Sequence, residues 1–210
     1  MEIDDYHAAA DDTGPGFQTR PSTRAMRRRA LAATIAGLLA CTVSAWPSAV
    51  AQTPQRRPDV RYLPTPQNVV EAMLEFADVS RDDVVYDLGS GDGRIPITAA
   101  VKYGARGVGI EIDPALVRLS EENARKAGVA DRVRFVAGDL FQADIREATV
   151  VALFLMPGMN IELIPKFRAQ LRQGARIVAH HFTMGDRWMP DAERDVNGLM
   201  IYRWDIAGSW

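Results

Sequence analysis

Three glycines at alternate positions, Gly89, Gly91 and Gly93, follow directly after a short apolar run in which Asp87 is the one acid. Because glycine has no Cβ, such a turn lets backbone N–H groups approach a ligand closely, and the helix that begins there adds its own unpaired N–H groups. Ser90 stands between the first two glycines and is included in the predicted site. The pattern predicts a ligand-binding turn between a strand and a helix, with a carboxylate beside it.

The spacing of the glycines and the charge beside them limit the class of ligand. A dinucleotide site has the spacing G-x-G-x-x-G, whereas this turn has G-x-G-x-G, and Arg94 stands where the third glycine would be. A P-loop continues with Lys and Ser or Thr, which do not follow these glycines. The carboxylate of Asp87 would repel a phosphate and attract an ammonium group. A ligand with an amino-acid end, a ribose and no phosphate fits best, and S-adenosylmethionine is such a ligand.

Further carboxylates follow the next two predicted strands. Glu111 stands at the end of the first, where a carboxylate can accept hydrogen bonds from both ribose hydroxyls, and Ile112 is placed in the same site. Asp113 is expected to cap the following helix. Asp139 comes after the second strand and could accept from the adenine amino group, with Leu140 packing on the ring or donating its N–H. The alternative for Asp139 is a simple turn acid.

The predicted strand 149–155 leads into an apolar segment, residues 154–157, where methyltransferases of small-molecule and nucleobase amines often carry Asn/Asp-Pro-Pro-Tyr. The different sequence argues against N6-adenine methylation and predicts an apolar channel mouth that suits a lysine amine. His180 and His181 fall in the predicted strand 175–182, and one of them could take a proton from the amine, since an unperturbed imidazole has a pKa near 6.5. A packed strand histidine is the alternative, so the catalytic residue stays unassigned. A sulfonium is already activated, so methyl transfer depends on alignment and needs no metal.

Residues 62–204 resemble the class I S-adenosylmethionine-dependent methyltransferases. Within that superfamily they are most similar to bacterial relatives of the ATP synthase c-subunit lysine N-methyltransferase family. The resemblance rests on residues 62–66, 85–94, 109–114 and 138–140. It implies the class I fold, S-adenosylmethionine as cofactor, a protein lysine as methyl acceptor, and a position for Tyr62 and Thr65 over the methionine end of the cofactor. Two alternatives stay open: a small-molecule N- or O-methyltransferase, and a non-catalytic protein that binds an adenosyl ligand.

Strands and helices alternate along the chain, which predicts a Rossmann-like, doubly wound and mostly parallel sheet. A first helix, capped by Thr65 and opened by Pro66, is followed by predicted helices at 94–103, 114–127 and 161–172. The predicted strands are 84–88, 107–112, 133–136, 149–155, 175–182 and 199–205. One strand follows 175–182, so the sheet could lack its last antiparallel strand. The cofactor is expected at the carboxyl ends of the strands.

Charge and cysteine content exclude some classes of protein. A formal net charge of −2 over 210 residues predicts no nucleic-acid-binding surface. The single cysteine, Cys41, excludes an intrachain disulfide and a Cys-based zinc site. The chain divides into a segment 1–25 that is disordered or upstream of the true start, a signal peptide or membrane anchor at 26–51, a linker at 52–60, and a methyltransferase domain at 61–210.

Residues 26–51 have the three parts of an export signal: basic residues 27–29, an apolar stretch at 30–43, and small residues before Gln52. This predicts an exported or membrane-associated domain in the periplasm, with membrane contact only through the N-terminal segment. A lipid anchor on Cys41, or a cytoplasmic protein if the segment is not used, are the alternatives. S-adenosylmethionine is made in the cytosol, so export leaves open how the domain meets its cofactor.

Overall fold

The computed structural model describes residues 63–208. The predictions for residues 1–25, 26–51 and 52–60, and for Tyr62, lie outside the described residues. Among residues 63–208, none of the helices combines the length and the apolar character that crossing a bilayer requires.

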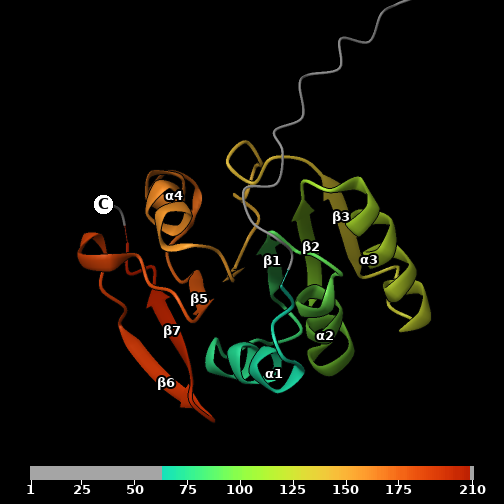
Figure 1. Cartoon of the computed structure of the whole chain (residues 1–210), viewed down its shortest axis with the longest axis horizontal. Coiled ribbons are helices and arrows are strands. Elements are labelled where there is room, and N and C mark those ends of the chain that lie inside the picture. The colour runs from blue at the N-terminus through green and yellow to red at the C-terminus, as the bar shows by residue number, and fades with distance from the viewer. Residues whose placement is uncertain (1–62, 209–210) are drawn as a thin grey trace, which may run out of the picture. The chain divides into compact units, whose positions relative to one another are not determined.

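A seven-stranded sheet with strand order β3-β2-β1-β4-β5-β7-β6 forms the centre of the domain (Figure 1). The strands are β1 (Val84–Leu88), β2 (Arg106–Glu111), β3 (Val133–Ala137), β4 (Val150–Leu153), β5 (Arg176–His180), β6 (Ala192–Val196) and β7 (Leu199–Asp205). The first five pair in parallel, and β7 pairs antiparallel with both β5 and β6. The predicted doubly wound, mostly parallel fold is confirmed. The order reverses between β1 and β4, which is where open α/β sheets bind ligands.

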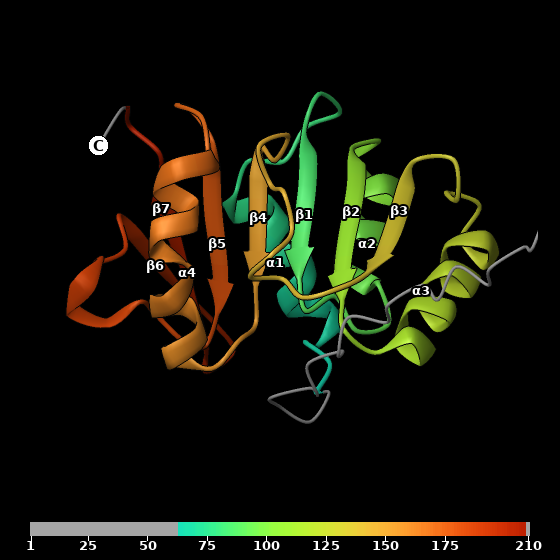
Figure 2. The same cartoon turned by 90° about the horizontal axis from the view of Figure 1, so that it is seen from above.

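Helices cover both faces of this sheet (Figure 2). α1 (Gln67–Phe76) and α2 (Arg94–Tyr103) pack on one face, and α4 (Pro157–Gln170) packs on the other. α3 (Pro114–Lys126) lies against β3 and beside α2, and a short 3-10 helix, η1 (Gly185–Arg187), follows β5. The sheet is therefore the middle layer of three.

β1 is buried along its whole length, because its side chains alternate between two covered faces. Tyr86 and Leu88 belong to the apolar cluster under α4, whereas Val85 packs with Met73 of α1. A strand covered on both faces needs apolar residues at nearly every position, which is why β4 and most of β1 are continuous apolar runs. Asp87, at 3% exposure, is the polar exception in β1.

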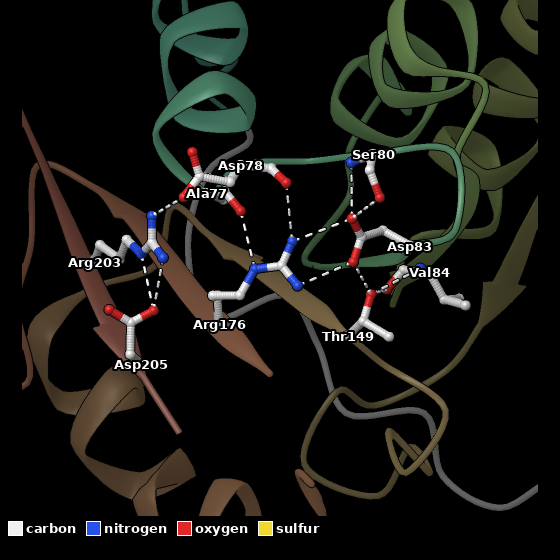
Figure 3. A network of polar contacts seen from close by, with 9 residues as sticks. All are labelled: Ala77, Asp78, Ser80, Asp83, Val84, Thr149, Arg176, Arg203 and Asp205. Carbon is white, nitrogen blue, oxygen red and sulfur yellow. Dashed lines mark hydrogen bonds and ion pairs between the residues drawn. The ribbon is translucent and has the colours of Figure 1, made fainter. Parts of the chain in front are cut away.

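The amino ends of β1, β4 and β5 are joined by the Asp83–Arg176 network, which consists of Ser80, Asp83, Thr149 and Arg176 (Figure 3). The Asp83 carboxylate accepts hydrogen bonds from Ser80, Thr149 and the guanidinium of Arg176, which lies at 3.0 Å. Arg176 also donates to two backbone carbonyl oxygens just after α1. Burial by itself would raise the pKa of Asp83, but these donors outweigh burial and lower the pKa to about 2. The network thus ties the end of α1 to three strands.

The expectation that the sheet lacks its last antiparallel strand is wrong. The additional strand, β6, precedes β7 instead of following it. Its sequence, Ala-Glu-Arg-Asp-Val, is charged and partly exposed because β6 is an edge strand, so it has no apolar signature. Asn197 and Gly198 connect the two strands with φ angles of 55° and 86°, as in a two-residue hairpin turn. This Asn-Gly pair is the sequence signal that identifies the hairpin.

Three further boundaries differ from the prediction. Thr65 does not cap α1, since Pro66 occupies the N-cap position and no side chain in the described part of the chain caps the helix. α4 begins at Pro157, earlier than expected, and continues through Pro165. β4 and β5 are shorter than predicted, because the residues after them leave the ladder and form loops. The other predicted elements with stated ranges are confirmed to within about one residue at each end.

Candidate active site

A cavity of about 760 Å³ lies at the carboxyl ends of β1, β2, β4 and β5. Its walls come from the segment before α1, the glycine turn, and the loops after these strands. The predicted site residues that line it are Thr65, Asp87, Gly89, Ser90, Glu111, Ile112, Leu140, His180 and His181. Gly91, Gly93 and Asp139 are not among the lining residues, and Tyr62 lies outside the described part of the chain. The fold therefore gathers most of the predicted residues around one hollow.

The glycine turn depends on backbone conformations that glycine favours. Gly89, Gly91 and Gly93 have φ angles of 85°, 54° and 79°. A Cβ on Gly93 would lie 2.6 Å from the ring of Phe135 in β3, and a Cβ on Gly109 would lie 2.5 Å from the Ser90 hydroxyl. Gly93 therefore allows α2 to pack closely on the sheet, which is the task of the third glycine in dinucleotide sites.

Glu111 holds the glycine turn from the neighbouring strand. One carboxylate oxygen accepts the N–H of Gly91 at 2.8 Å, and the other accepts the N–H of Asp113 at 2.9 Å. A carboxylate has about four lone-pair positions, so both oxygens can also accept a ligand hydroxyl. Asp113 caps α3, as predicted, by accepting the N–H of Ala115 at 2.7 Å. Glu111 thus shapes the turn and presents a carboxylate to the cavity.

Asp87 and Ser90 are buried polar residues in the same wall. Burial, together with the negative charges of Glu111 and Asp92, raises the pKa of Asp87 to about 8. The Ser90 hydroxyl has no hydrogen-bond partner among residues 63–208. Buried polar groups normally have partners, so this wall suits a ligand that brings a positive charge and its own polar atoms.

Arg94 connects the segment before α1 to the glycine turn through hydrogen bonds. Its guanidinium pairs with Asp92 through two contacts of 2.9 and 2.7 Å, and it donates to the carbonyl oxygen of Thr65 at 2.8 Å. Arg94, which stands where a dinucleotide site has its third glycine, thus ties Asp92 of the turn to the segment before α1. Thr65 is buried at the cavity wall, so this segment forms one side of the site.

Asp139 and Leu140 lie in the loop after β3. The Asp139 carboxylate accepts the N–H of Phe141 at 2.9 Å, which is the contact expected of a turn acid. Leu140 reaches the cavity from this loop. The adenine-binding role of Asp139 stays a prediction.

The loops after β4 and β5 form the other end of the cavity. Phe154, Leu155 and Met156 supply apolar wall, and His180 lies beside Phe154 with ring centroids 4.2 Å apart. His180 is 4% exposed, and neither of its ring nitrogens has a hydrogen-bond partner within residues 63–208. Burial and the adjacent His181 lower the pKa of His180 to about 4. Its imidazole is therefore neutral at pH 7 and is a weaker proton acceptor than a histidine with the ordinary pKa.

The family model of the ANTKMT methyltransferase domain matches residues 87–192, a span that runs from Asp87 in β1 to the start of β6. The chain belongs to this family. It is an S-adenosylmethionine-dependent methyltransferase, as the glycine turn and its neighbouring acids predicted.

Individual relatives agree with this assignment. The methyltransferase is 48% identical to a protein-lysine N-methyltransferase of Saccharolobus islandicus over 134 residues, which are 63% of this chain and 83% of the relative. It is 37% identical to the ATP synthase c-subunit lysine N-methyltransferase of Xenopus laevis over 130 residues, which are 62% of this chain and 56% of that relative. One similar solved structure is the crystal structure of an RNA methyltransferase from Salinibacter ruber in complex with S-adenosyl-L-homocysteine. Its sequence is 57% identical to this chain, and the two structures superpose with a TM-score of 0.69. The match covers 70% of this chain and 96% of that chain.

The cofactor of this methyltransferase is S-adenosylmethionine, and the residues of the cavity fit it. The cavity wall formed by Asp87 and Ser90 would hold the amino-acid end of the cofactor, and Glu111 would hold its ribose. Ile112 and Leu140 present apolar side chains where adenine would lie. The bound cofactor supplies an electrophilic methyl group on its sulfonium.

Asn160 lies behind the cavity wall and supports the site, which the sequence did not reveal. It is 1% exposed, and its side-chain N–H group donates to the carbonyl oxygen of Phe182 at 3.2 Å, which fixes the loop after β5 against α4. Phe182 also lines the cavity. The predicted helix 161–172 leaves Asn160 outside it, so the sequence gives no sign that this side chain is buried. A helix starting at Pro157 would have marked it as a buried polar residue.

Proposed function

We propose that this methyltransferase transfers a methyl group to the ε-amine of a protein lysine. The observation that carries the proposal is the acceptor end of the cavity, where Phe154, Leu155 and Met156 form an apolar wall next to the neutral His180. Such a wall suits the four-carbon stem of lysine and its uncharged amine. The 48% identity to a protein-lysine N-methyltransferase supports the same acceptor.

The cofactor is proposed to lie across the tips of β1, β2 and β3. Its ammonium group approaches Asp87, its ribose hydroxyls donate to Glu111, and its adenine packs beside Leu140 with Asp139 near the amino group. This arrangement directs the sulfonium methyl toward the loops after β4 and β5, where the acceptor end lies.

In the reaction, the lysine nitrogen attacks the methyl carbon while the bond between that carbon and sulfur breaks. The nitrogen lone pair forms the new N–C bond, the C–S electron pair stays on sulfur, and the product is S-adenosylhomocysteine. The lysine must arrive neutral, and an apolar channel favours this by lowering the pKa of the amine. The proton leaves to water. Holding nitrogen, carbon and sulfur in line contributes on the order of 7–11 kcal/mol in well-oriented reactions.

The charges around the cavity favour a cationic substrate. Four acidic side chains among the described residues line it, those of Asp87, Asp92, Glu111 and Asp113. Asp92 pairs with Arg94, and Asp87 holds a proton at pH 7 in the free protein, so the negative charge comes from Glu111 and Asp113. This charge attracts an approaching lysine ammonium and raises its local concentration before it loses its proton.

RNA is the second candidate acceptor, because the Salinibacter ruber structure at 57% identity is described as an RNA methyltransferase. Binding a polyanion depends on Lys and Arg side chains that neutralise phosphates. The acidic cavity and the formal net charge of −2 make protein the better-supported acceptor.

The test is transfer of tritiated methyl from S-adenosylmethionine to three separate fractions: cell-envelope proteins, total RNA and a metabolite extract. We expect label in the protein fraction, recovered after acid hydrolysis as methyl-lysine. Label confined to RNA or to small molecules would overturn the lysine proposal and assign the acceptor to that class instead.

We also propose that residues 26–51 export this domain. The support is the order of basic, apolar and small residues in that segment. Mass spectrometry of the native N-terminus is expected to find a chain that begins at Gln52. A chain that retains residues 27–29, or a lipid on Cys41, would contradict cleavage at this site.

A further inference from the structure

His180 is a buried imidazole to which residues 63–208 offer no hydrogen-bond partner. It is 4% exposed, it lines the cavity, and both of its nitrogens are without a hydrogen bond among residues 63–208. A buried unsatisfied polar group is destabilising, so its presence in a functional cavity needs an explanation. The Ser90 hydroxyl, which lies at the cofactor end of the same cavity, is also buried without a hydrogen-bond partner among the described residues.

The backbone around His180 has an uncommon conformation. The N–H of Phe182 donates to the carbonyl oxygen of His180 at 2.8 Å, and His181 between them has a φ of 70°. A three-residue turn of this kind with positive φ at its centre is rare and strained, and strained backbone of this kind clusters at functional sites. We call residues 180–182 the γ-turn.

Contacts from two elements hold the γ-turn in place. The N–H of His181 donates to the carbonyl oxygen of Met200 in β7 at 2.8 Å, and buried Asn160 of α4 donates to the carbonyl oxygen of Phe182 at 3.2 Å. A strained turn persists only when its surroundings determine its conformation, and these two contacts do so. The result is that His180 and Phe182 both reach the cavity wall.

The register of the sheet places His180 at the acceptor end. Leu153 of β4 pairs with Ala179 of β5, so the residues that follow them, Phe154 and His180, lie side by side just beyond the β4–β5 ladder, where His180 still pairs with β7. Asp87 is on β1, and β4 lies between β1 and β5. A cofactor over β1 and β2 would therefore have His180 across the cavity from its amino-acid end.

We propose that His180 binds the incoming lysine amine directly, as a neutral hydrogen-bond acceptor that aims the nitrogen lone pair at the methyl group. This inference rests on the proposed lysine methylation. A ring nitrogen of His180 accepts an N–H from the amine, while the nitrogen lone pair forms the bond to the methyl carbon and the C–S pair returns to sulfur. The excess proton leaves to water, so His180 stays neutral throughout. The low pKa of its imidazole agrees with a hydrogen-bonding role and not with proton storage.

The test compares His180→Phe with His180→Gln in the full chain. Phenylalanine removes two unsatisfied nitrogens and keeps the ring beside Phe154, so the variant is expected to fold with a melting temperature no lower than the wild type. Two quantities are measured: the dissociation constant for S-adenosylhomocysteine by calorimetry, and the initial rate of tritiated-methyl transfer to the envelope-protein fraction.

We expect His180→Phe to bind S-adenosylhomocysteine within about twofold of the wild type and to lose at least about 100-fold in transfer rate, since one missing positioning contact can cost that much. His180→Gln, whose amide oxygen can accept the same N–H, is expected to recover at least about tenfold of that loss. His181→Gly keeps the γ-turn, because glycine adopts positive φ, and is expected to lose less than His180→Phe.

Three results would overturn the inference: transfer by His180→Phe within about threefold of the wild type, a glutamine variant as slow as the phenylalanine variant, or an equal loss in His181→Gly. The second of these would indicate proton transfer in place of hydrogen bonding. If the wild type labels no protein, the lysine proposal itself fails, which is distinct from failure of the His180 assignment.

Discussion

Asp83 and Asp87 are four residues apart, at opposite ends of β1, and are almost equally buried, at 6% and 3% exposure. The pKa values of their carboxyl groups nevertheless shift in opposite directions. In the Asp83–Arg176 network, hydrogen bonds and an ion pair outweigh burial and lower the pKa of Asp83 to about 2 (Figure 3). At the cavity, burial and two neighbouring acids raise the pKa of Asp87 to about 8.

The difference shows that burial does not determine the role of a carboxylate, whereas the partners around it do. At the amino ends of the strands the fold supplies the partners, and the network stabilises the native state. At the carboxyl ends Asp87 carries a high pKa, and Ser90 and His180 lack hydrogen-bond partners among residues 63–208. A bound cofactor and acceptor can supply what those groups lack. One end of the sheet thus contributes stability and the other contributes binding.

The largest effect on stability is expected from Asp83→Asn. The variant leaves the partly buried guanidinium of Arg176 without its counter-charge, which should lower the free energy of unfolding at pH 7 by about 3 kcal/mol. The folded pKa of about 2 lies below the unfolded value of about 3.9, so the stabilisation is present above pH 4 and is lost as the pH falls toward 2. Urea unfolding at pH 7 and pH 3 should therefore show a smaller difference at pH 3. Affinity for S-adenosylhomocysteine should be retained, and a large loss would contradict the separation of the two ends.

The same substitution at the other end of β1, Asp87→Asn, should have the opposite effect on stability. Losing the carboxylate should weaken cofactor binding by about 100-fold, or about 2.7 kcal/mol. The folded pKa of about 8 exceeds the unfolded value, so the ligand-free wild type loses stability as the pH rises from 4 to 8. The asparagine variant avoids this loss and should be more stable than the wild type at pH 8, by about 1 kcal/mol or more. Calorimetry measures the affinity for the cofactor, and urea unfolding measures the stability. A variant that binds the cofactor as tightly as the wild type would contradict the assignment of Asp87.

Glu111→Ala should weaken cofactor binding by about 2 kcal/mol, because it removes an acceptor for the ribose hydroxyls and for the N–H of Gly91. The matched control is Glu147→Ala, an exposed glutamate that pairs with Arg106 and lies away from the cavity lining. Calorimetric titration with S-adenosylhomocysteine compares the two variants. Equal affinities for both would show that Glu111 only shapes the turn.

The smallest effect concerns pH. If the ammonium group of the cofactor binds ionised Asp87, binding below pH 8 must release the proton that Asp87 holds in the free protein. Affinity should then rise about tenfold between pH 6 and pH 7 and level off near pH 8, where an α-amino group itself begins to lose its charge. Calorimetry in two buffers with different heats of ionisation counts the protons. Absence of proton release in the wild type would place the ammonium elsewhere.

The position of the cofactor site could be predicted from local sequence, because its parts are local. An apolar strand, an acid and a glycine turn are consecutive in the chain, and Glu111 ends the next strand, so parallel topology alone brings them to one edge. Of the β6–β7 hairpin, β7 was predicted at 199–205 and β6 was not, because an exposed edge strand has no apolar pattern. The positions of Asn160 and of the γ-turn depend on contacts between distant segments.

By itself, the sequence determined the strand–turn–helix unit, the doubly wound order and the chemistry of the cofactor, since each follows from neighbouring residues and their spacing. The tertiary structure alone decided which polar groups find partners. The opposite pKa shifts of Asp83 and Asp87 depend on Arg176 and Thr149 at one end and on Glu111 and burial at the other. The imidazole of His180 has no hydrogen-bond partner among residues 63–208. The physical reason is that burial and hydrogen bonding are set by what packs around a group, and packing across a sheet joins segments that the sequence keeps apart.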